Sequence, residues 1–268
     1  MPIKLCVAGA TGWTGSAVTR RILQTPAFQL VGVIARQSVG RDIGAVLGGP
    51  DAGITVVASL ADVLPAQPDV LIDYTRPDSV KTRVLYALDH GVRVVIGTSG
   101  LTADDYRDID AHARRQGLGV IAAGNFSITA ALAKHFALLA AKHLPAWEII
   151  DYAHAGKPDA PSGTTRELAE ELAEIASNHL ELPLDQTHGA KEARGASIAG
   201  TQVHSIRLHS YVIAFETIFG LPDERLTIRH DAGAGAEPYV AGTLLAAQRA
   251  MHTTGLVRGL DRLLFGTP

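Results

Sequence analysis

Residues 151–165 form a polar loop that combines several groups able to bind or protonate a ligand. The loop reads D-Y-A-H-A-G-K-P-D-A-P-S-G-T-T and lies between a strand-like apolar run and a helical segment. Backbone N–H groups at a helix N-terminus favour an anion, because they lie at the positive end of the helix dipole. Ser162, Gly163 and Thr164 stand at this helix start and predict a site for a carboxylate or phosphate oxygen.

Two further side chains in the loop could act on the same ligand. Lys157 can supply a positive charge or a proton, and His154 is the only loop side chain that titrates near neutral pH. Simpler interpretations stay open, in which Ser162 only caps the helix, Lys157 is solvated and His154 is a strand-end histidine. One histidine without a cysteine is too few ligands for zinc, so we expect no metal.

The composition indicates a globular protein of the cytoplasm. The 268 residues are 47% hydrophobic and 19% charged, and the formal net charge of −3 makes nucleic acid an unfavourable partner. No apolar run approaches the roughly 20 residues of a membrane span, and the N-terminus lacks a secretory signal pattern. A single cysteine, Cys6, fits a reducing compartment.

The N-terminal segment predicts a dinucleotide-binding turn. An apolar run over residues 3–9 leads into Gly9-Ala-Thr-Gly-Trp-Thr-Gly15, and residues 16–24 have a helical pattern. In such a strand–turn–helix unit, glycines let the backbone approach a pyrophosphate that rests on the helix N-terminus. The spacing is G-x-x-G-x-x-G rather than G-x-G-x-x-G, so a tight turn without a ligand is the alternative.

The strand that follows, residues 29–34, bears on the choice of cofactor. NAD-specific sites place an acidic residue near the end of this strand, whereas an arginine accommodates a 2′-phosphate. Here the acid is absent and Arg36 occupies the region. We therefore expect NADPH, with NADH possible; an exposed, solvated arginine would look identical in sequence.

Alternating strands and helices over the first 125 residues predict a Rossmann-like, doubly wound parallel α/β sheet. Two strand ends carry loops of small or polar residues, at 97–100 (G-T-S-G) and 124–127 (G-N-F-S). Small residues allow close approach of a flat cofactor ring. Further strands are expected at 54–57, 70–73, 92–96 and 118–122, with helices capped by Asp78 and opened by Thr102.

The pattern changes in the second half, which predicts an α+β domain with an open, mostly antiparallel sheet. Three strand-like runs are expected at 202–208, 211–219 and 225–230, and the last two, joined by a tight turn at 221–224, are expected to pair antiparallel. This sheet could supply an oligomer interface. We place the dinucleotide-binding domain at 1–126 and 236–268, and the substrate-binding and oligomerisation domain at 127–235. The expected helices are 128–142, 162–176 and 239–251; residues 177–200 form a polar excursion, and a short tail ends the chain.

Several of these stretches resemble the dihydrodipicolinate reductase (4-hydroxy-tetrahydrodipicolinate reductase) family, over essentially the full length of the chain. The most specific is Lys157-Pro-Asp-Ala-Pro-Ser-Gly-Thr164. The others are the glycine turn, Val39–Gly44, Asp73-Tyr-Thr-Arg-Pro77, Gly97–Gly100, Gly124–Ser127, His204-Ser-Ile-Arg207 and Glu224–Ile228.

The resemblance implies an N-terminal domain that binds NAD(P)H, completed by the C-terminal helix, and a central domain that binds substrate and forms a tetramer through its sheet. It assigns the substrate carboxylates to His154, Lys157, Gly163 and Thr164. It assigns the nucleotide to Gly9, Ala10, Thr11, Gly12, Trp13, Thr14, Arg36, Gly97, Thr98, Ser99, Ala123, Gly124, Asn125 and Phe126.

Three stretches depart from the family pattern. The family loop begins Glu-x-His-His, with the first histidine as proton donor; here Ala153 stands at that position. Trp13-Thr14 replaces Arg-Met, and Ile213-Ala-Phe215 replaces Gly-Glu-His. A general acid typically raises the reaction rate about 10²- to 10⁴-fold, so its loss is compatible with slower hydride transfer.

We therefore expect an NAD(P)H-dependent reductase of a C=N bond, or of an equivalent conjugated double bond, in a small carboxylated substrate. The leading substrate is 4-hydroxy-tetrahydrodipicolinate, in lysine and diaminopimelate biosynthesis. Lys157 and His154 are the candidate catalytic residues, and one of them or water would deliver the proton. The alternatives are a related imine reductase or amino-acid dehydrogenase, and a non-catalytic nucleotide-binding paralogue. The presence of Lys157 and of the Ser162–Thr164 turn argues against the paralogue.

Overall fold

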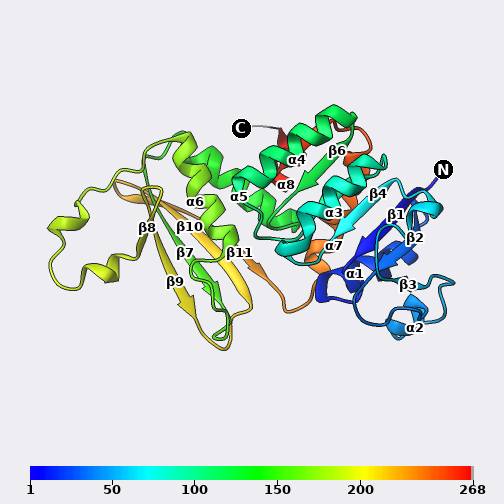
Figure 1. Ribbon diagram of the computed structural model, residues 1–268. Coiled ribbons are helices and arrows are strands. Elements are labelled where there is room, and N and C mark those ends of the chain that lie inside the picture. Colours follow the sequence, from blue (N-terminus) through cyan, green and yellow to red (C-terminus); the bar gives the residue numbers. More distant parts are fainter. Residues whose placement is uncertain (267–268) are drawn as a thin grey trace. The chain divides into compact units, whose positions relative to one another are not determined.

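The computed structural model describes residues 1–266 and divides the chain into two compact units (Figure 1). Unit 1 comprises Met1–Ile128 and Ala236–Leu264. Unit 2 comprises Thr129–Gly235 and the chain end from Phe265, whose ring stacks on His135 at 4.2 Å. The sequence placed all of 236–268 in the first domain; residues 267–268 lie outside the described chain.

Unit 1 contains a seven-stranded parallel sheet, which confirms the predicted doubly wound class. Its strands are β1 (Ile3–Ala8), β2 (Phe28–Ile34), β3 (Val56–Val57), β4 (Val70–Asp73), β5 (Arg93–Ile96), β6 (Gly119–Ala122) and β12 (Gly255–Arg258). The order is β12-β6-β5-β4-β1-β2-β3, so the chain reverses direction across the sheet between β1 and β4. Ligands of such sheets bind at this reversal, beyond the carboxyl ends of the strands.

Helices cover both faces of this sheet. α3 (Pro77–Asp89) and α4 (Ala103–Gln116) pack against each other and against one face, through a core that includes Cys6, Ala8 and Leu71. Leu5 and Val7 alternate with them and are fully buried beneath α1 (Trp13–Leu23) and α7 (Glu237–Ala250). α2 (Ile43–Val46), the 3₁₀ turn η1 (Leu64–Ala66) and α8 (Leu260–Phe265) complete the helices of this part. Within residues 1–266, no helix is long and apolar enough to cross a bilayer.

Several local predictions can be compared directly with these elements. Thr102 stands at the start of α4, as predicted, and the structure shows that it forms a reciprocal capping box with Asp105. Asp78 is not a cap: α3 begins one residue earlier, at Pro77, because proline is favoured at the first helical position, so Arg76 stands at the N-cap. β12 and α8 were not predicted, because segments of four and six residues are too short to show a recognisable hydrophobic periodicity.

Unit 2 contains a five-stranded mixed sheet of order β11-β10-β7-β9-β8. The strands are β7 (Ala146–Ala153), β8 (Ala196–Ile198), β9 (Thr201–Arg207), β10 (Ile213–Leu221) and β11 (Glu224–Ala232). α5 (Ile128–Ala141) and α6 (Gly163–Ile175) bury apolar residues of one face, among them Trp147, Phe215 and Phe219. The excursion before β8 contains only the short turns η2 (Leu184–Gln186) and η3 (Lys191–Arg194), drawn in yellow-green in Figure 1.

The predicted antiparallel pairing of the last two strands is correct. β10 and β11 are antiparallel neighbours. β9 does not pair with β10; it lies on the opposite edge of β7 and runs parallel to it. β7 is the central strand of the sheet, and its Trp147 and Ile149 are buried in the core that includes residues of α5 and α6. The connection from β9 to β10 consequently passes the carboxyl end of β7, where the polar loop begins.

Gly15→Ala tests how tightly the turn after β1 is packed. A Cβ at Gly15 would lie 2.1 Å from the carbonyl oxygen of Gly9, so the turn and α1 would have to separate. We expect a loss of about 1–3 kcal/mol in unfolding free energy, the usual cost of overpacking, measured by urea denaturation. Gly49→Ala is the control, because its Cβ would meet only Gly44 O, at 3.7 Å. Equal stability of the two variants would contradict this packing.

Candidate active site

The glycine turn after β1 leaves no room for side chains. Gly9 has φ +81°, and a Cβ there would lie 2.2 Å from the carbonyl oxygen of Tyr74. The N–H of Gly12 donates to Gly9 O at 2.9 Å, and Ala10 is fully buried. The turn is therefore held directly against the segment that follows β4, with Thr11 and Gly12 exposed on its outer side.

The start of α1 fits an anionic ligand. The first N–H groups of any helix lack partners within the helix. α4 and α6 satisfy one of these donors with Thr102 and Ser162, whereas the N-cap of α1, Gly12, has no side chain to do so. The combination of a close-packed glycine turn and an uncapped helix start matches the needs of a dinucleotide pyrophosphate.

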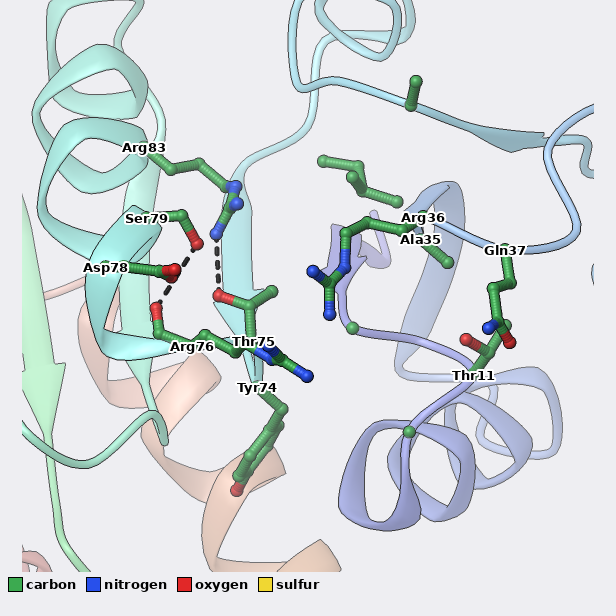
Figure 2. A pocket seen from close by; sticks show the side chains of 14 residues that line it. Thr11, Ala35, Arg36, Gln37, Tyr74, Thr75, Arg76, Asp78, Ser79 and Arg83 are labelled. Atoms are coloured by element: carbon green, nitrogen blue, oxygen red, sulfur yellow. Dashed lines mark hydrogen bonds between the residues drawn. The ribbon is translucent and has the colours of Figure 1, made fainter.

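A pocket of about 750 Å³ lies beside this turn, at the carboxyl ends of β1, β2 and β4 (Figure 2). Arg36 and Arg76 extend into it from opposite sides. Within residues 1–266 neither guanidinium has an ion-pair partner, and both residues are exposed. Asp78 is the one acidic residue among the lining side chains. The two free cations make the pocket suited to a nucleotide that carries an additional phosphate.

A buried carboxylate beneath the pocket holds the strand-end loops in place. Asp73 is fully buried and pairs with Arg83 at 2.5 Å. Its carboxylate also accepts hydrogen bonds from the hydroxyls of Thr75 (2.6 Å) and Thr98 (2.9 Å). The Thr75 N–H donates to the Thr98 hydroxyl at 2.8 Å. The loops after β4 and β5 are thereby joined, and the charge of Arg83 is already neutralised.

A second hollow of about 240 Å³ continues from the first, since Tyr74 and Thr75 line both. Its other lining residues are Trp13, Thr14, Pro77, Gly97, Thr98 and Ser99. Tyr74 is fixed here by a 2.6 Å hydrogen bond to Thr243, and burial raises the pKa of its phenol. The structure thus brings together most of the residues predicted to hold the cofactor, and adds Tyr74, which sequence reasoning missed.

The predicted segment after β6 lies apart from both hollows. Ala123 and Phe126 are buried, and Phe126 packs edge-on against Tyr74 with ring centroids 6.3 Å apart. The Asn125 side chain accepts the N–H of Ser127 at 2.8 Å, and Gly124 is exposed. Their direct contact with a cofactor stays a prediction; their visible role is to support Tyr74.

In unit 2, the polar loop closes on itself around Lys157. Its N–H donates to His154 O at 3.0 Å, which forms a turn. Its ammonium pairs with Asp159 at 2.7 Å, and this hydrogen bond holds the pKa of the Asp159 carboxyl below its usual value. The His154 side chain is exposed. A substrate carboxylate that binds Lys157 must therefore share or replace Asp159.

At the start of α6, some hydrogen-bond donors are used within the protein and others are free for a ligand. Ser162 is buried, and its hydroxyl caps α6 by accepting the N–H of Thr165. Its own N–H donates to Asp151 at 3.0 Å. Among the described residues, the N–H groups of Gly163 and Thr164 take no partner, and Gly163 is exposed. These two groups are the ones available to an anion, with Ser162 serving as the cap.

Asp151 and Arg207 form an ion pair at the base of the loop, and sequence reasoning gave neither residue a role. Asp151 is fully buried, 2.7 Å from Arg207. Burial pushes the Asp151 pKa upward, but hydrogen bonds from Arg207 and Ser162 outweigh it and hold the pKa below its ordinary value. An acidic residue within the apolar run of β7 was the signal available in the sequence.

Ala153 ends β7 as a fully buried residue paired with Ile213. Its methyl group cannot donate a proton, so His154 and Lys157 are the titratable donors nearest in the loop. Among residues 1–266, no three His, Cys, Asp or Glu side chains are grouped in a way that could hold a metal ion.

Comparison with known proteins gives the same assignment for both units. The family description "Dihydrodipicolinate reductase, N-terminus" matches residues 3–126, and "Dihydrodipicolinate reductase, C-terminus" matches residues 126–264. An amine dehydrogenase from Mycobacterium smegmatis shares the fold, with a TM-score of 0.67 at 16% identity over 98% of this chain and 96% of that one.

Full-length relatives carry the name of one enzyme. The 4-hydroxy-tetrahydrodipicolinate reductases of Moorella thermoacetica and Carboxydothermus hydrogenoformans are 38% and 36% identical, over 98% of this chain and 98% and 99% of theirs. The dipicolinate-bound dihydrodipicolinate reductase of Paenisporosarcina sp. TG-14 has a TM-score of 0.86 at 30% identity, over 98% of this chain and 100% of that one. This chain therefore belongs to the dihydrodipicolinate reductase family of NAD(P)H-dependent oxidoreductases.

Proposed function

We propose that this protein uses NADPH to reduce 4-hydroxy-tetrahydrodipicolinate, the reaction for which its curated relatives are named. The observation that carries the proposal is that one loop of unit 2 contains both the Lys157 ammonium and the unbonded N–H groups of Gly163 and Thr164. A cation beside a helix start is suited to a carboxylate. The reduced nicotinamide supplies the hydride, and the protein supplies binding and orientation.

Unit 1 is the dinucleotide-binding domain in this proposal. The turn from Gly9 to Thr14 would hold the pyrophosphate at the start of α1, which no side chain caps. Residues 97–99 would lie against the nicotinamide, because they line the smaller hollow with Trp13 and Tyr74. Arg36 and Arg76 would bind the 2′-phosphate in the larger pocket, which is the reason to prefer NADPH over NADH.

Unit 2 is the substrate-binding domain. Lys157, Gly163 and Thr164 would bind one substrate carboxylate, with Ser162 supporting them as the cap of α6. The proton that completes C=N reduction would come from Lys157, His154 or water, since Ala153 has no proton to give. The Lys157 ammonium, which pairs with Asp159, would be both a carboxylate ligand and a proton source close to it.

The face of the unit 2 sheet that α5 and α6 leave uncovered is the proposed oligomer interface. It presents the half-buried Ile150, Ile206 and Ile218. Around them lie polar contacts such as Glu148–His204 at 2.7 Å and Arg229 over the Tyr152 ring at 4.8 Å. An apolar strip with a polar border suits association of identical subunits, as a tetramer or a dimer. A cytoplasmic location stays a prediction.

Replacement of Lys157 tests the substrate site. We expect Lys157→Ala to raise the KM for freshly generated 4-hydroxy-tetrahydrodipicolinate about ten- to a hundredfold, because a hydrogen bond to a charged group contributes roughly 1.5–3 kcal/mol. The KM for NADPH should not change. The assay follows NADPH oxidation, and Lys142→Ala, an exposed lysine of the same unit, is the control.

Two results would contradict parts of this proposal. Turnover and KM unaffected by Lys157→Ala would remove the lysine from the site. No turnover by the parent protein, with turnover gained in Ala153→His, would show that the chain lacks the reaction for want of a proton donor.

Replacement of Arg36 tests the cofactor preference. We expect Arg36→Asp to raise the KM for NADPH at least about tenfold, because a carboxylate would repel the 2′-phosphate where an arginine attracted it. The KM for NADH should stay the same or fall, since a carboxylate can accept the ribose hydroxyls. Arg41→Asp, an exposed arginine outside the pocket lining, is the control. Equal losses with both cofactors would show that Arg36 does not bind the 2′-phosphate.

A further inference from the structure

The Asp151 carboxylate lies at the base of the polar loop and receives hydrogen bonds from the helix end of the loop and from the neighbouring strand. At the helix end, Oδ2 accepts the N–H of Ser162 at 3.0 Å and Oδ1 accepts the hydroxyl of Thr165 at 3.1 Å. From the neighbouring strand, the Ser205 hydroxyl donates to Oδ2 at 3.2 Å and Arg207 Nη2 donates at 2.7 Å. The Asp151 side chain has no surface exposed to solvent.

Arg207 carries this connection onward into the middle of the loop. The same Nη2 atom that pairs with Asp151 also donates to the backbone carbonyl of Asp159, at 2.7 Å. The side chain of Asp159 in turn pairs with Lys157 Nζ, at 2.7 Å. A continuous series of three short polar contacts therefore runs from the buried carboxylate to the ammonium that would bind substrate.

A charged residue is not needed here to fill the core. The other inward-facing residues of β7, Trp147, Ile149 and Ala153, are apolar and fully or almost fully buried. Replacing a buried ion pair with apolar residues of similar volume is often neutral or stabilising. Unlike an apolar side chain, a carboxylate accepts directional hydrogen bonds. It therefore fixes the positions of the particular donors that surround it.

We propose that Asp151, acting through Arg207 and Ser162, is a positioning residue for the substrate carboxylate. It sets Lys157 and the N–H groups of Gly163 and Thr164 at the separation at which all three bind one carboxylate. Asp151 is buried beneath them and takes no part in the chemistry. The inference rests on the proposed function of this loop and names the device that keeps the loop in its binding shape.

The test uses Asp151→Asn and Arg207→Lys in the full-length protein, with dipicolinate as the probe. Asparagine keeps the shape of the side chain but removes the charge, and lysine keeps the charge but cannot span both Asp151 and Asp159. We expect dipicolinate affinity to fall roughly ten- to a hundredfold in each, the range for displacement of a positioned group. The substrate KM should rise in parallel, with kcat changed less and NADPH binding unchanged.

Lys134→Met is the matched control. Lys134 is also buried, and its charged contacts in unit 2 include Glu167 at 2.9 Å and Glu171 at 2.8 Å, which join α5 to α6 and lie outside residues 151–165. We expect this variant to melt at a lower temperature with dipicolinate affinity unchanged. Loss of affinity in Lys134→Met equal to that in Asp151→Asn would mean that any weakening of unit 2 has this effect, and would overturn the positioning role.

A double-mutant cycle that combines Asp151→Asn with Lys157→Ala distinguishes failure of the positioning role from failure of the proposed function. If Asp151 acts by positioning Lys157, the losses in dipicolinate affinity should not add, because the second change removes what the first had already displaced. Additive losses, or normal affinity in both folded Asp151→Asn and Arg207→Lys, would overturn the inference alone. Normal affinity in Lys157→Ala would instead overturn the proposed function. If Asp151→Asn does not fold, Arg207→Lys decides, since it leaves the Asp151 carboxylate with Ser162 and Thr165.

Discussion

In each unit an ion pair between a buried aspartate and an arginine fixes the loop that carries the site. Asp73 pairs with Arg83 at the end of β4, and Asp151 pairs with Arg207 near the end of β7. A buried carboxylate is costly unless every lone pair is matched by a donor. The loop conformation that supplies those donors is therefore strongly preferred. Through this preference Thr75 and Thr98 are held together in unit 1, and the helix end and the middle of the polar loop are held in unit 2.

The helix starts of α1 in unit 1 and of α6 in unit 2 use their positive ends differently. α1 begins at Gly12, which offers no side chain to the free N–H groups, and the glycine turn allows a ligand to approach them closely. α6 begins at Ser162, whose hydroxyl and N–H are both directed inward, to Thr165 and Asp151. Only Gly163 and Thr164 then remain for a ligand. The first arrangement suits an extended pyrophosphate and the second a single carboxylate.

The replacement of a histidine by Ala153 removes the proton donor of the family pattern but leaves the other proposed parts of the site in place. In the proposed function the cofactor supplies the hydride, and substrate orientation would depend on Lys157 and the start of α6, which are both present. Loss of a general acid typically lowers the rate about 10²- to 10⁴-fold, and Lys157, His154 or water would take its place in the proposed function. Family membership and an altered proton donor are therefore compatible.

The sequence alone determined the features that short-range physics decides. The glycine turn, the helix start at Thr102, the Ser162 cap and the Lys157–Thr164 motif are readable because each depends on neighbours within a few residues. Only the tertiary structure decided that β9 runs parallel to β7, that β12 completes the first sheet, and that Arg76 faces Arg36. It also decided that Asp151 meets Arg207, 56 residues away. Such contacts depend on which strands become neighbours, and periodicity within one strand carries no information about its partner.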